Sequence, residues 1–406
     1  MDVTQALALL GGLTPQQFMR RHWQKKPLLV RQAIPGFTPV LDRRELFGLA
    51  AQPQVESRLV QQQAKGWRMK QGPFGPRSLP ALSAPAWTLL VQGVDLHDAR
   101  AHALLQNFRF VPDARLDDLM ISFATAGGGV GPHFDSYDVF LLQASGRRRW
   151  KIGRQKDLSL QEGVPLKILQ NFEPEEEFVL DAGDMLYLPP RYAHDGLAEP
   201  CVGTDGKAGD CMTYSIGFRA PAKAELAGEL LQRLADFGDA DAAMAGRPLL
   251  YRDASQPATP NPAQLPSSLL EFARQAVHDA LKDPLALACV LGEYLTEPKA
   301  SVWFDEALGN WSPRHPAGLC LDPRSRMMYD ARHVFLNGES YRAKGADAAL
   351  MRRLADQRRL SAAELRRASP SALELLADWH AAGWLMHAPA RGSGSGMKIA
   401  KTGGAS

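Results

Sequence analysis

The strongest chemical signal in the sequence is a His-x-Asp motif that follows a glycine-rich run. Gly127–Gly131 leads into His133, Asp135 and Tyr137. We predict a strand over His133–Gln143, in which side chains two residues apart face the same side. One imidazole and one carboxylate on one face supply two of the three ligands of a 2-His-1-carboxylate site for non-haem Fe(II). The motif alone is weak, because His133 could instead be an ordinary surface residue.

A second histidine follows a predicted turn, strand and bend. The turn begins at Asp181, the apolar strand spans Met185–Leu188, and Pro189 and Pro190 precede His194. In a barrel such a bend can present His194 to His133 and Asp135; the alternative is a loop histidine stacked on Tyr192. The segments together predict an Fe(II) site with open positions for 2-oxoglutarate and O2.

A dicarboxylate cosubstrate also needs a cation, and Arg147–Ile152 offers several. With a period of two, Arg148 shares a face with Trp150 and Ile152, while the other basic residues share the opposite face. We therefore predict that Arg148 points into the barrel. A buried arginine must be paired, and its planar fork matches a carboxylate. The alternative is an internal ion pair between Arg148 and an Asp or Glu.

Short predicted strands surround these motifs from about Trp67 to Phe218. Many short strands with turn residues between them favour a closed all-β barrel or jelly roll. We expect Ala144–Gly146 to join two of them as a tight hairpin. Besides His133–Gln143, the predicted strands are Leu119–Ala124, Arg147–Ile152, Glu177–Leu180, Met185–Leu188 and Met212–Phe218.

The pattern changes after Pro221. Leucine-rich helices are predicted over Ala222–Phe237 and Ser268–Leu295, with a proline-rich loop at Gln256–Pro266 between them. From Trp303 to Ala388, short strands and helices alternate, which is typical of a winged helix. The predicted strands are Met327–Tyr329 and His333–Leu336, with Asn337-Gly338 as a hairpin turn, and the predicted helices are Ala346–Gln357, Ser361–Arg367 and Ser371–Ala382.

Composition excludes several classes of protein. The 406 residues hold 47 Lys and Arg against 44 Asp and Glu, which argues against a chain that binds nucleic acid over its whole surface. We interpret the basic stretch Tyr341–Arg367 as a solvated helix face and expect no direct nucleic-acid binding. No apolar run approaches a membrane span of roughly 20 residues. The cysteines (Cys201, Cys211, Cys289 and Cys320) form no C-x-x-C pair, as expected for a reducing cytoplasm.

Several segments closely resemble the JmjC-type ribosomal oxygenases of the cupin superfamily, and most of all their bacterial branch, the ribosomal-protein arginine hydroxylases. The resemblance is specific over residues 14–220 and looser to about residue 388. The segments that carry it are Phe18–Arg31, Asp117–Phe123, Gly127–Gly153, Gly183–Gly196 and Tyr214–Pro221.

The resemblance implies a mixed fold. A double-stranded β-helix (cupin/JmjC jelly roll) catalytic domain over 1–220 would be followed by an α-helical dimerisation domain over 221–298, a winged-helix-like domain over 299–390 and a flexible tail over 391–406. It also implies a homodimer that uses Fe(II), 2-oxoglutarate and O2. The bacterial branch hydroxylates the β-carbon of one arginine in the sixteenth protein of the large ribosomal subunit.

The resemblance also assigns site residues. His133, Asp135 and His194 would bind the metal, and Arg148 would bind 2-oxoglutarate; the animal relatives place lysine there and hydroxylate histidine. A hydroxyl residue that assists Arg148 could be Ser122, Ser215 or Thr213, since Ala124 stands where bacterial relatives place a small hydroxyl residue. The contacts to the target arginine would come from Asp118, Met120 and Tyr137, although Asp118 could instead cap a turn and Met120 could be core.

Three further segments near the site carry expectations. The acidic stretch Glu173–Glu177 would attract a basic substrate if it borders the entrance, and Gly127–Gly131 would be a mobile backbone that approaches the peptide. Cys201–Asp210 is a glycine-rich insertion near the third ligand. The alternatives to an arginine hydroxylase are a histidyl hydroxylase, a lysine demethylase, a non-catalytic cupin and a winged-helix regulator that reads DNA.

Overall fold

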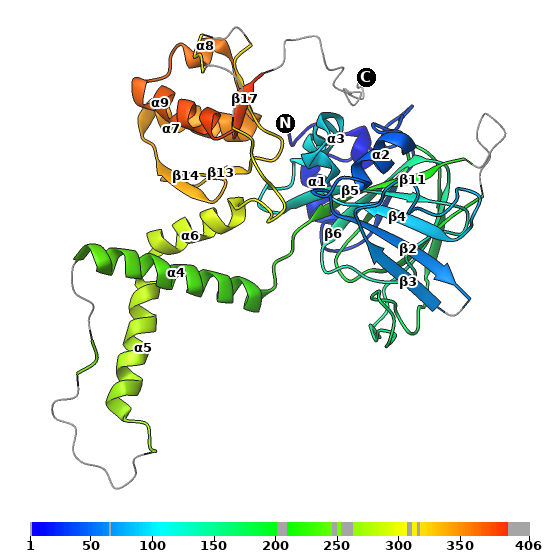
Figure 1. Cartoon of the computed structure of the whole chain (residues 1–406), viewed down its shortest axis with the longest axis horizontal. Coiled ribbons are helices and arrows are strands. Elements are labelled where there is room, and N and C mark those ends of the chain that lie inside the picture. Colours follow the sequence, from blue (N-terminus) through cyan, green and yellow to red (C-terminus); the bar gives the residue numbers. More distant parts are fainter. Residues whose placement is uncertain are drawn as a thin grey trace. The chain divides into compact units, whose positions relative to one another are not determined.

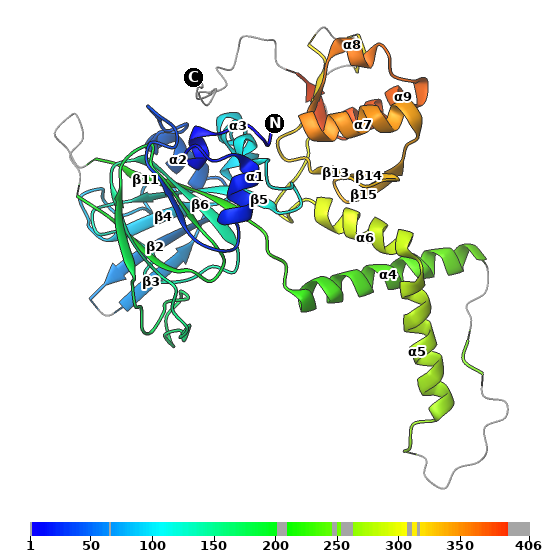
Figure 2. The ribbon, with the colours of Figure 1, turned by 180° about the vertical axis from the view of Figure 1, so that it is seen from behind.

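A computed structural model of the chain describes residues 2–64, 66–200, 209–245, 250–252, 263–306, 311–314 and 317–388. The described residues form two compact units, one up to Ala220 and the other from Pro221 (Figures 1 and 2). Most of the predicted insertion Cys201–Asp210, most of the proline-rich loop Gln256–Pro266 and the predicted tail over 391–406 lie outside the described residues.

The first unit is a β-sandwich made of a large and a small antiparallel sheet. In the large sheet the strand order is β1-β9-β6-β11-β5-β4-β2-β3, and in the small sheet it is β10-β7-β8. Apolar side chains of β6, β7, β8 and β9 form one cluster that includes Leu141, Trp150 and Leu180. The strands are β1 (Leu28–Val30), β2 (Ser57–Gln63), β3 (Gly66–Gln71), β4 (Trp87–Val91), β5 (Leu116–Ala124), β6 (Asp138–Ser145), β7 (Arg148–Gly153), β8 (Glu176–Leu180), β9 (Met185–Leu188), β10 (Ala193–Ala198) and β11 (Cys211–Phe218).

Two local predictions are wrong here. Ala144–Gly146 is not a hairpin, because β6 pairs with β9 and β11 while β7 pairs with β8 and β10, so the turn carries the chain from one sheet to the other. The strand predicted over His133–Gln143 begins only at Asp138. Residues 133–137 form a loop in which His133 makes a single isolated bridge to His194.

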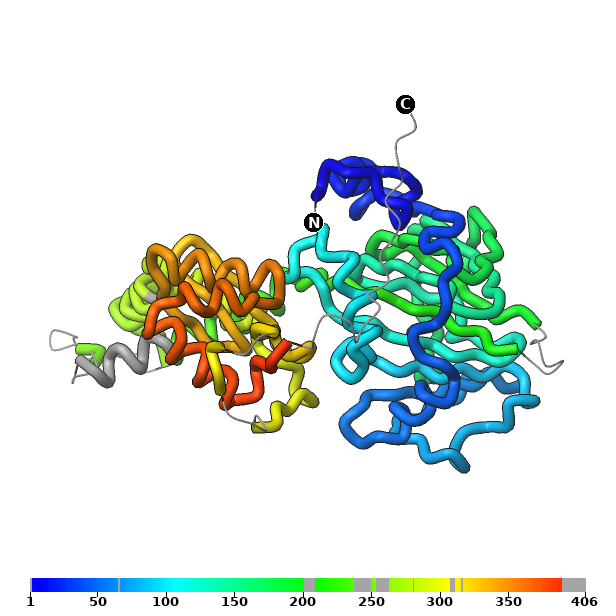
Figure 3. Tube along the Cα trace, turned by 90° about the horizontal axis from the view of Figure 1, so that it is seen from above, coloured from blue at the N-terminus to red at the C-terminus, as the bar shows by residue number. Residues whose placement is uncertain are grey.

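The N-terminal segment packs against the large sheet. Helix α1 (Pro15–Arg21) begins with a capping box formed by Thr14 and Gln17, and the adjacent β1 pairs with β9. Phe18 is fully buried and contacts Phe140 and Tyr187 of the sheet. In Figure 3 this blue segment crosses over the strands. Helices α2 (Arg43–Ala50) and α3 (Ala99–Leu105) complete the first unit together with short 3-10 turns.

The second unit opens with helices α4 (Lys223–Ala245), α5 (Ser267–Lys282) and α6 (Pro284–Thr296). The single helix predicted over Ser268–Leu295 is therefore wrong. Pro284 cannot donate a helical hydrogen bond, and the Asp283 carboxylate accepts one from the Leu285 N–H, which caps a new helix.

The rest of the second unit matches the predicted winged-helix pattern. The Asn337-Gly338 hairpin turn is present, with positive φ angles of 51° and 89°. Leu336, Leu354, Leu360 and Trp379 belong to its buried core. Its elements are β12 (Leu319–Leu321), β13 (Met327–Tyr329), β14 (His333–Leu336), β15 (Glu339–Arg342), α7 (Gly345–Gln357), β16 (Arg359–Leu360), α8 (Ala362–Leu365), α9 (Pro370–Ala381) and β17 (Leu385–His387).

Candidate active site

The two histidines of the site are joined through their backbones. The His133 N–H donates to the His194 carbonyl at 2.9 Å, and the His194 N–H donates to the His133 carbonyl at 2.8 Å. This bridge holds the two ring centroids 4.2 Å apart. The loop that carries His133 is thereby tied to β10, which carries His194.

Backbone carbonyls orient both imidazole rings. Nδ1 of His133 lies 2.8 Å from the Gly131 oxygen, and Nδ1 of His194 lies 2.9 Å from the Tyr192 oxygen. Because a carbonyl oxygen only accepts, each Nδ1 carries a hydrogen, and Nε2 is the ring nitrogen that remains for a metal. Burial, reinforced by the neighbouring His133, lowers the pKa of His194 to about 4. His194 is therefore neutral at pH 7, as a metal ligand must be.

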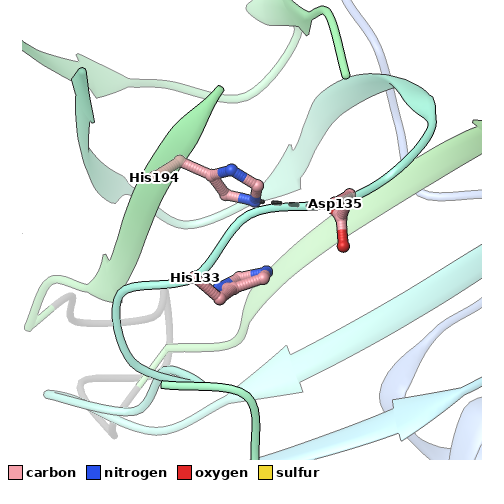
Figure 4. Close-up of side chains that lie close together, drawn as sticks. All are labelled: His133, Asp135 and His194. Carbon is pink, nitrogen blue, oxygen red and sulfur yellow. Dashed lines mark ion pairs between the residues drawn. The ribbon is translucent and has the colours of Figure 1, made fainter. Parts of the chain in front are cut away.

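Asp135 completes a three-residue cluster (Figure 4). Its Oδ2 lies 3.7 Å from Nε2 of His194, and the potential ligand atoms of His133, Asp135 and His194 all lie within 4.8 Å of one another. The backbone N–H of Arg191 donates to the Asp135 carbonyl at 2.7 Å, which fixes the loop. Two imidazole nitrogens and one carboxylate are the donors of a facial Fe(II) site, so the residues present fit such a metal.

Tyr137 also belongs to this cluster. Burial and the neighbouring carboxylates of Asp135 and Asp118 raise the pKa of Tyr137 far above its usual value. The hydroxyl therefore stays protonated beside the Asp135 carboxylate.

Arg148 points inward, as the strand pattern predicted. Along β7, Arg148, Trp150 and Ile152 are buried, while Arg149 and Lys151 are partly exposed. Arg148 is 5% exposed and makes no ion pair within the described part of the chain. Its Nε and Nη2 atoms are buried without a hydrogen-bond partner. Unsatisfied buried donors are costly, so the guanidinium fits a ligand carboxylate.

One cavity of about 480 Å³ joins these residues. Its size suits a small cosubstrate together with one substrate side chain. It is lined by the triad (His133, Asp135 and His194), by Arg148, and by the predicted hydroxyl residues Ser122, Thr213 and Ser215. Ala124 is buried but does not line it.

The predicted substrate contacts Asp118, Met120 and Tyr137 line the same cavity. Gly217 separates two of them: a Cβ built on it would lie 3.7 Å from Oδ1 of Asp118 and 3.8 Å from the Tyr137 ring. Oδ2 of Asp118 accepts a hydrogen bond from the Gly93 N–H at 3.1 Å. A carboxylate and an aromatic ring thus face the gap that the glycine leaves.

Two segments expected near the rim make well-defined contacts in the structure. Within the run Gly127–Gly131, close packing requires glycine at two positions, because a Cβ on Gly128 would lie 2.4 Å from the Trp87 oxygen and one on Gly131 would lie 2.5 Å from Ile168. None of Glu173–Glu177 lines the cavity, and Glu177 pairs instead with Arg149 on the outer face of β7.

Sequence reasoning missed part of the cavity wall. Arg58, which donates to Gln92 at 2.6 Å, lines it together with Met69, Asp117 and Lys167. Arg58 and Met69 belong to β2 and β3, which carry no chemical motif. Their place in the wall depends on the pairing of β3 with β2 and of β2 with β4.

Two family models match the chain. Residues 103–226 match the JmjC domain, and residues 279–386 match the ROXA-like winged helix. A curated relative is the ribosomal protein uL16 3-hydroxylase of Escherichia coli, 36% identical over 289 residues that cover 70% of this chain and 71% of the relative. A probable ribosomal oxygenase of Haemophilus influenzae is 36% identical over 214 residues, covering 52% and 50% of the two chains.

Solved structures of ribosomal oxygenases also resemble this chain. An X-ray structure of E. coli YcfD matches with a TM-score of 0.78 and 30% identity, covering 92% of this chain and 98% of that one. A YcfD structure in complex with cobalt and 2-oxoglutarate matches with a TM-score of 0.75, 30% identity and the same coverage. The resemblance drawn from the sequence motifs is thus confirmed, and the chain belongs to the JmjC-domain ribosomal oxygenases with a ROXA-like winged helix, which are 2-oxoglutarate-dependent enzymes.

Proposed function

We propose that the chain hydroxylates the β-carbon of an arginine in the large-subunit ribosomal protein uL16, with Fe(II), 2-oxoglutarate and O2. The observation that carries this proposal is the placement of Asp118 and Tyr137 on either side of Gly217, in the cavity that also holds the triad. A guanidinium can bind a carboxylate through two hydrogen bonds and stack on an aromatic ring. The E. coli relative is named a ribosomal protein uL16 3-hydroxylase, which agrees with the proposed target protein.

Each residue of the site has a distinct role in this proposal. Nε2 of His133, Nε2 of His194 and the Asp135 carboxylate would hold the metal. When bound, Fe(II) with 2-oxoglutarate and O2 supplies the oxidising chemistry, which inserts one oxygen atom into the C–H bond and leaves succinate and CO2. Arg148 would bind the distal carboxylate of 2-oxoglutarate, with a hydroxyl from Ser122 or Ser215 beside it.

The cavity walls would orient the substrate and limit the access of water. Tyr137 would place its ring beside the proposed guanidinium position, with its protonated hydroxyl near the Asp135 carboxylate. Val139, Leu141 and Trp150 form an apolar wall. Such a wall strengthens the ion pair between Asp118 and a bound arginine, because the local dielectric is low.

Histidine hydroxylation and lysine demethylation are the alternatives on this fold. A relative from Drosophila persimilis, 26% identical over 204 residues, is named a bifunctional lysine-specific demethylase and histidyl-hydroxylase. The cavity of this chain favours arginine, because a neutral imidazole gains less from the Asp118 carboxylate than a guanidinium does.

A peptide assay tests the substrate. We expect the full-length enzyme to add one oxygen atom to an arginine-containing uL16 peptide, detected by mass spectrometry, and to leave the arginine-to-histidine peptide unchanged. Asp118→Ala should reduce peptide hydroxylation by roughly a hundredfold, the cost of leaving a buried cation unpaired, while 2-oxoglutarate still binds. Oxidation of the histidine peptide alone, or release of formaldehyde from a methyl-lysine peptide, would contradict the assignment of arginine as the substrate.

The helical domain over 221–298 is proposed to form a homodimer. Its exposed apolar side chains support this, since contiguous apolar surface marks an interaction site; they include Leu231, Leu269, Leu270, Val277, Leu281 and Leu287.

We expect a dimer by light scattering at micromolar concentration. The double variant Val277→Asp and Leu281→Asp should shift the protein to a monomer, because the new charges would be buried in the interface. Leu82→Asp is the matched control, because Leu82 is a similarly exposed leucine of the first unit, and this variant should remain dimeric. A wild-type monomer would contradict the proposal.

We propose a reducing cytoplasm as the site of action. Cys211, Cys289 and Cys320 are free thiols in support of this. A separate finding is that no helix within the described residues is long and apolar enough to cross a membrane.

A further inference from the structure

A second cavity lies within the winged-helix region and is strongly basic. Its volume is about 580 Å³, and four of its lining residues, Arg332, Arg342, Lys344 and Arg352, carry a positive charge. No Asp or Glu is among the described residues that line it. Leu285, Gly345 and four alanines complete the wall, so small side chains leave room beside the charges.

The charges in this cavity are largely uncompensated. Arg332, Arg342 and Lys344 form no ion pair with any described residue. Arg352 donates to the Ala331 carbonyl at 2.9 Å, and its guanidinium lies over the Tyr329 ring. Repulsion between neighbouring cations without a counter-charge is unfavourable, and an anion that binds among them would relieve it.

Two other cations of the basic stretch Tyr341–Arg367 are engaged within the domain. Arg353 pairs with Glu364, and the Arg358 guanidinium donates to the carbonyls of Asp322 and Ser325. These contacts stabilise the fold of the domain. Arg359, Arg366 and Arg367 of this stretch are exposed and form no ion pair with any described residue, whereas Arg342, Lys344 and Arg352 line one cavity. The interpretation of the whole stretch as a solvated helix face did not predict this gathering of three cations.

The backbone around the cavity adds hydrogen-bond donors. Arg342 ends β15 and lies opposite His333 of β14, while Lys344 precedes α7. No side chain caps the N-terminus of α7 at Lys344. Asp347, in the first turn of α7, accepts a hydrogen bond from the Ser369 hydroxyl at 2.8 Å and does not line the cavity. Uncapped N–H groups beside unpaired cations favour a phosphate oxygen.

We propose that this cavity binds the phosphodiester backbone of single-stranded RNA, with Arg332, Arg342 and Lys344 each contacting a phosphate. The choice of RNA rests on the proposed function, because the proposed substrate is a ribosomal protein, which itself binds RNA. The cavity has the size of a small-ligand pocket, which suits one or two nucleotides. Such binding would hold the enzyme near its substrate protein without contributing to catalysis.

RNA binding by the full-length protein tests the proposal. Fluorescence anisotropy with a labelled single-stranded RNA of mixed sequence is measured over a salt series. Three phosphate contacts predict a slope of log K against log salt of about −2, at roughly 0.7 per phosphate. In the double variant Arg342→Ala and Lys344→Ala the slope should fall to about −0.7, and affinity at low salt should fall roughly tenfold or more.

A matched control distinguishes an effect of the cavity on RNA binding from an effect of net charge. Arg366 and Arg367 are exposed on the same domain outside the cavity, so Arg366→Ala with Arg367→Ala removes equal charge and should leave RNA affinity within about twofold. An equal loss in both double variants, no binding by the wild type at low salt, or tighter binding of duplex DNA would overturn the proposal. Peptide hydroxylation is measured on the same samples; it should not change, and its absence would count against the proposed function alone.

Discussion

Replacing His194 or Asp135 by alanine is expected to weaken Fe(II) binding by roughly a hundredfold or more and to abolish peptide hydroxylation. His194 is 3% exposed, its Nδ1 is committed to the Tyr192 carbonyl, and Nε2 is the only ring atom left to bind a metal. Loss of one ligand from a set of three leaves two donors and water. Anaerobic calorimetry with Fe(II) measures the affinity, and mass spectrometry of the peptide measures the activity.

His278→Ala is the control for the metal experiment. His278 is exposed on α5, so the same substitution there should change neither metal affinity nor hydroxylation. Thermal unfolding of the metal-free proteins should show that His194→Ala remains folded. A His194→Ala or Asp135→Ala variant that binds Fe(II) as tightly as the wild type would contradict the assignment of the triad.

The geometry that brings His133, Asp135 and His194 together could be predicted only in part. The sequence pattern placed His133, Asp135 and Tyr137 on one strand, whereas they lie in a loop and their proximity depends on the bridge between His133 and His194. Glycine and proline before His133 prevent a regular strand. The close packing of Gly128 and Gly129 against Trp87 and Gly196 then fixes the loop. That packing is long-range and leaves no local pattern.

Which residues of a strand point inward could be predicted where one face of the strand is basic and the other is apolar. The alternation Arg-Arg-Trp-Lys-Ile along β7 is local, and it predicted correctly which of its residues are buried. The partners of β7 could not be predicted in the same way, because both a hairpin and a crossover between sheets begin with a short turn. The contribution of Arg58 to the cavity could not be predicted either, since it depends on the order of strands in the large sheet.

The energetics of Arg148 follow from its surroundings. Two of its guanidinium nitrogens have no protein partner, and its guanidinium carbon lies 5.8 Å from the centroid of the Trp150 ring. The protein thus bears the desolvation cost of a buried cation before any ligand arrives. A carboxylate bound at this position offsets the desolvation cost of Arg148. The ion pair should therefore contribute strongly to the binding of 2-oxoglutarate.

Arg148→Ala should therefore raise the KM for 2-oxoglutarate by roughly 100- to 4,000-fold, which corresponds to the 3–5 kcal/mol lost when a buried ion pair is broken. Fe(II) affinity, measured by calorimetry without 2-oxoglutarate, should stay near the wild-type value. Arg149→Ala is the matched control: Arg149 lies one residue along β7, pairs with Glu177 and Glu199 on the outer face, and should leave the KM unchanged. If Arg149→Ala had the larger effect, the outer face of β7 would be the one that binds the cosubstrate. Loss of Fe(II) binding in Arg148→Ala would instead make Arg148 a structural support of the barrel, because a residue that binds only the distal carboxylate has no contact through which to affect the metal.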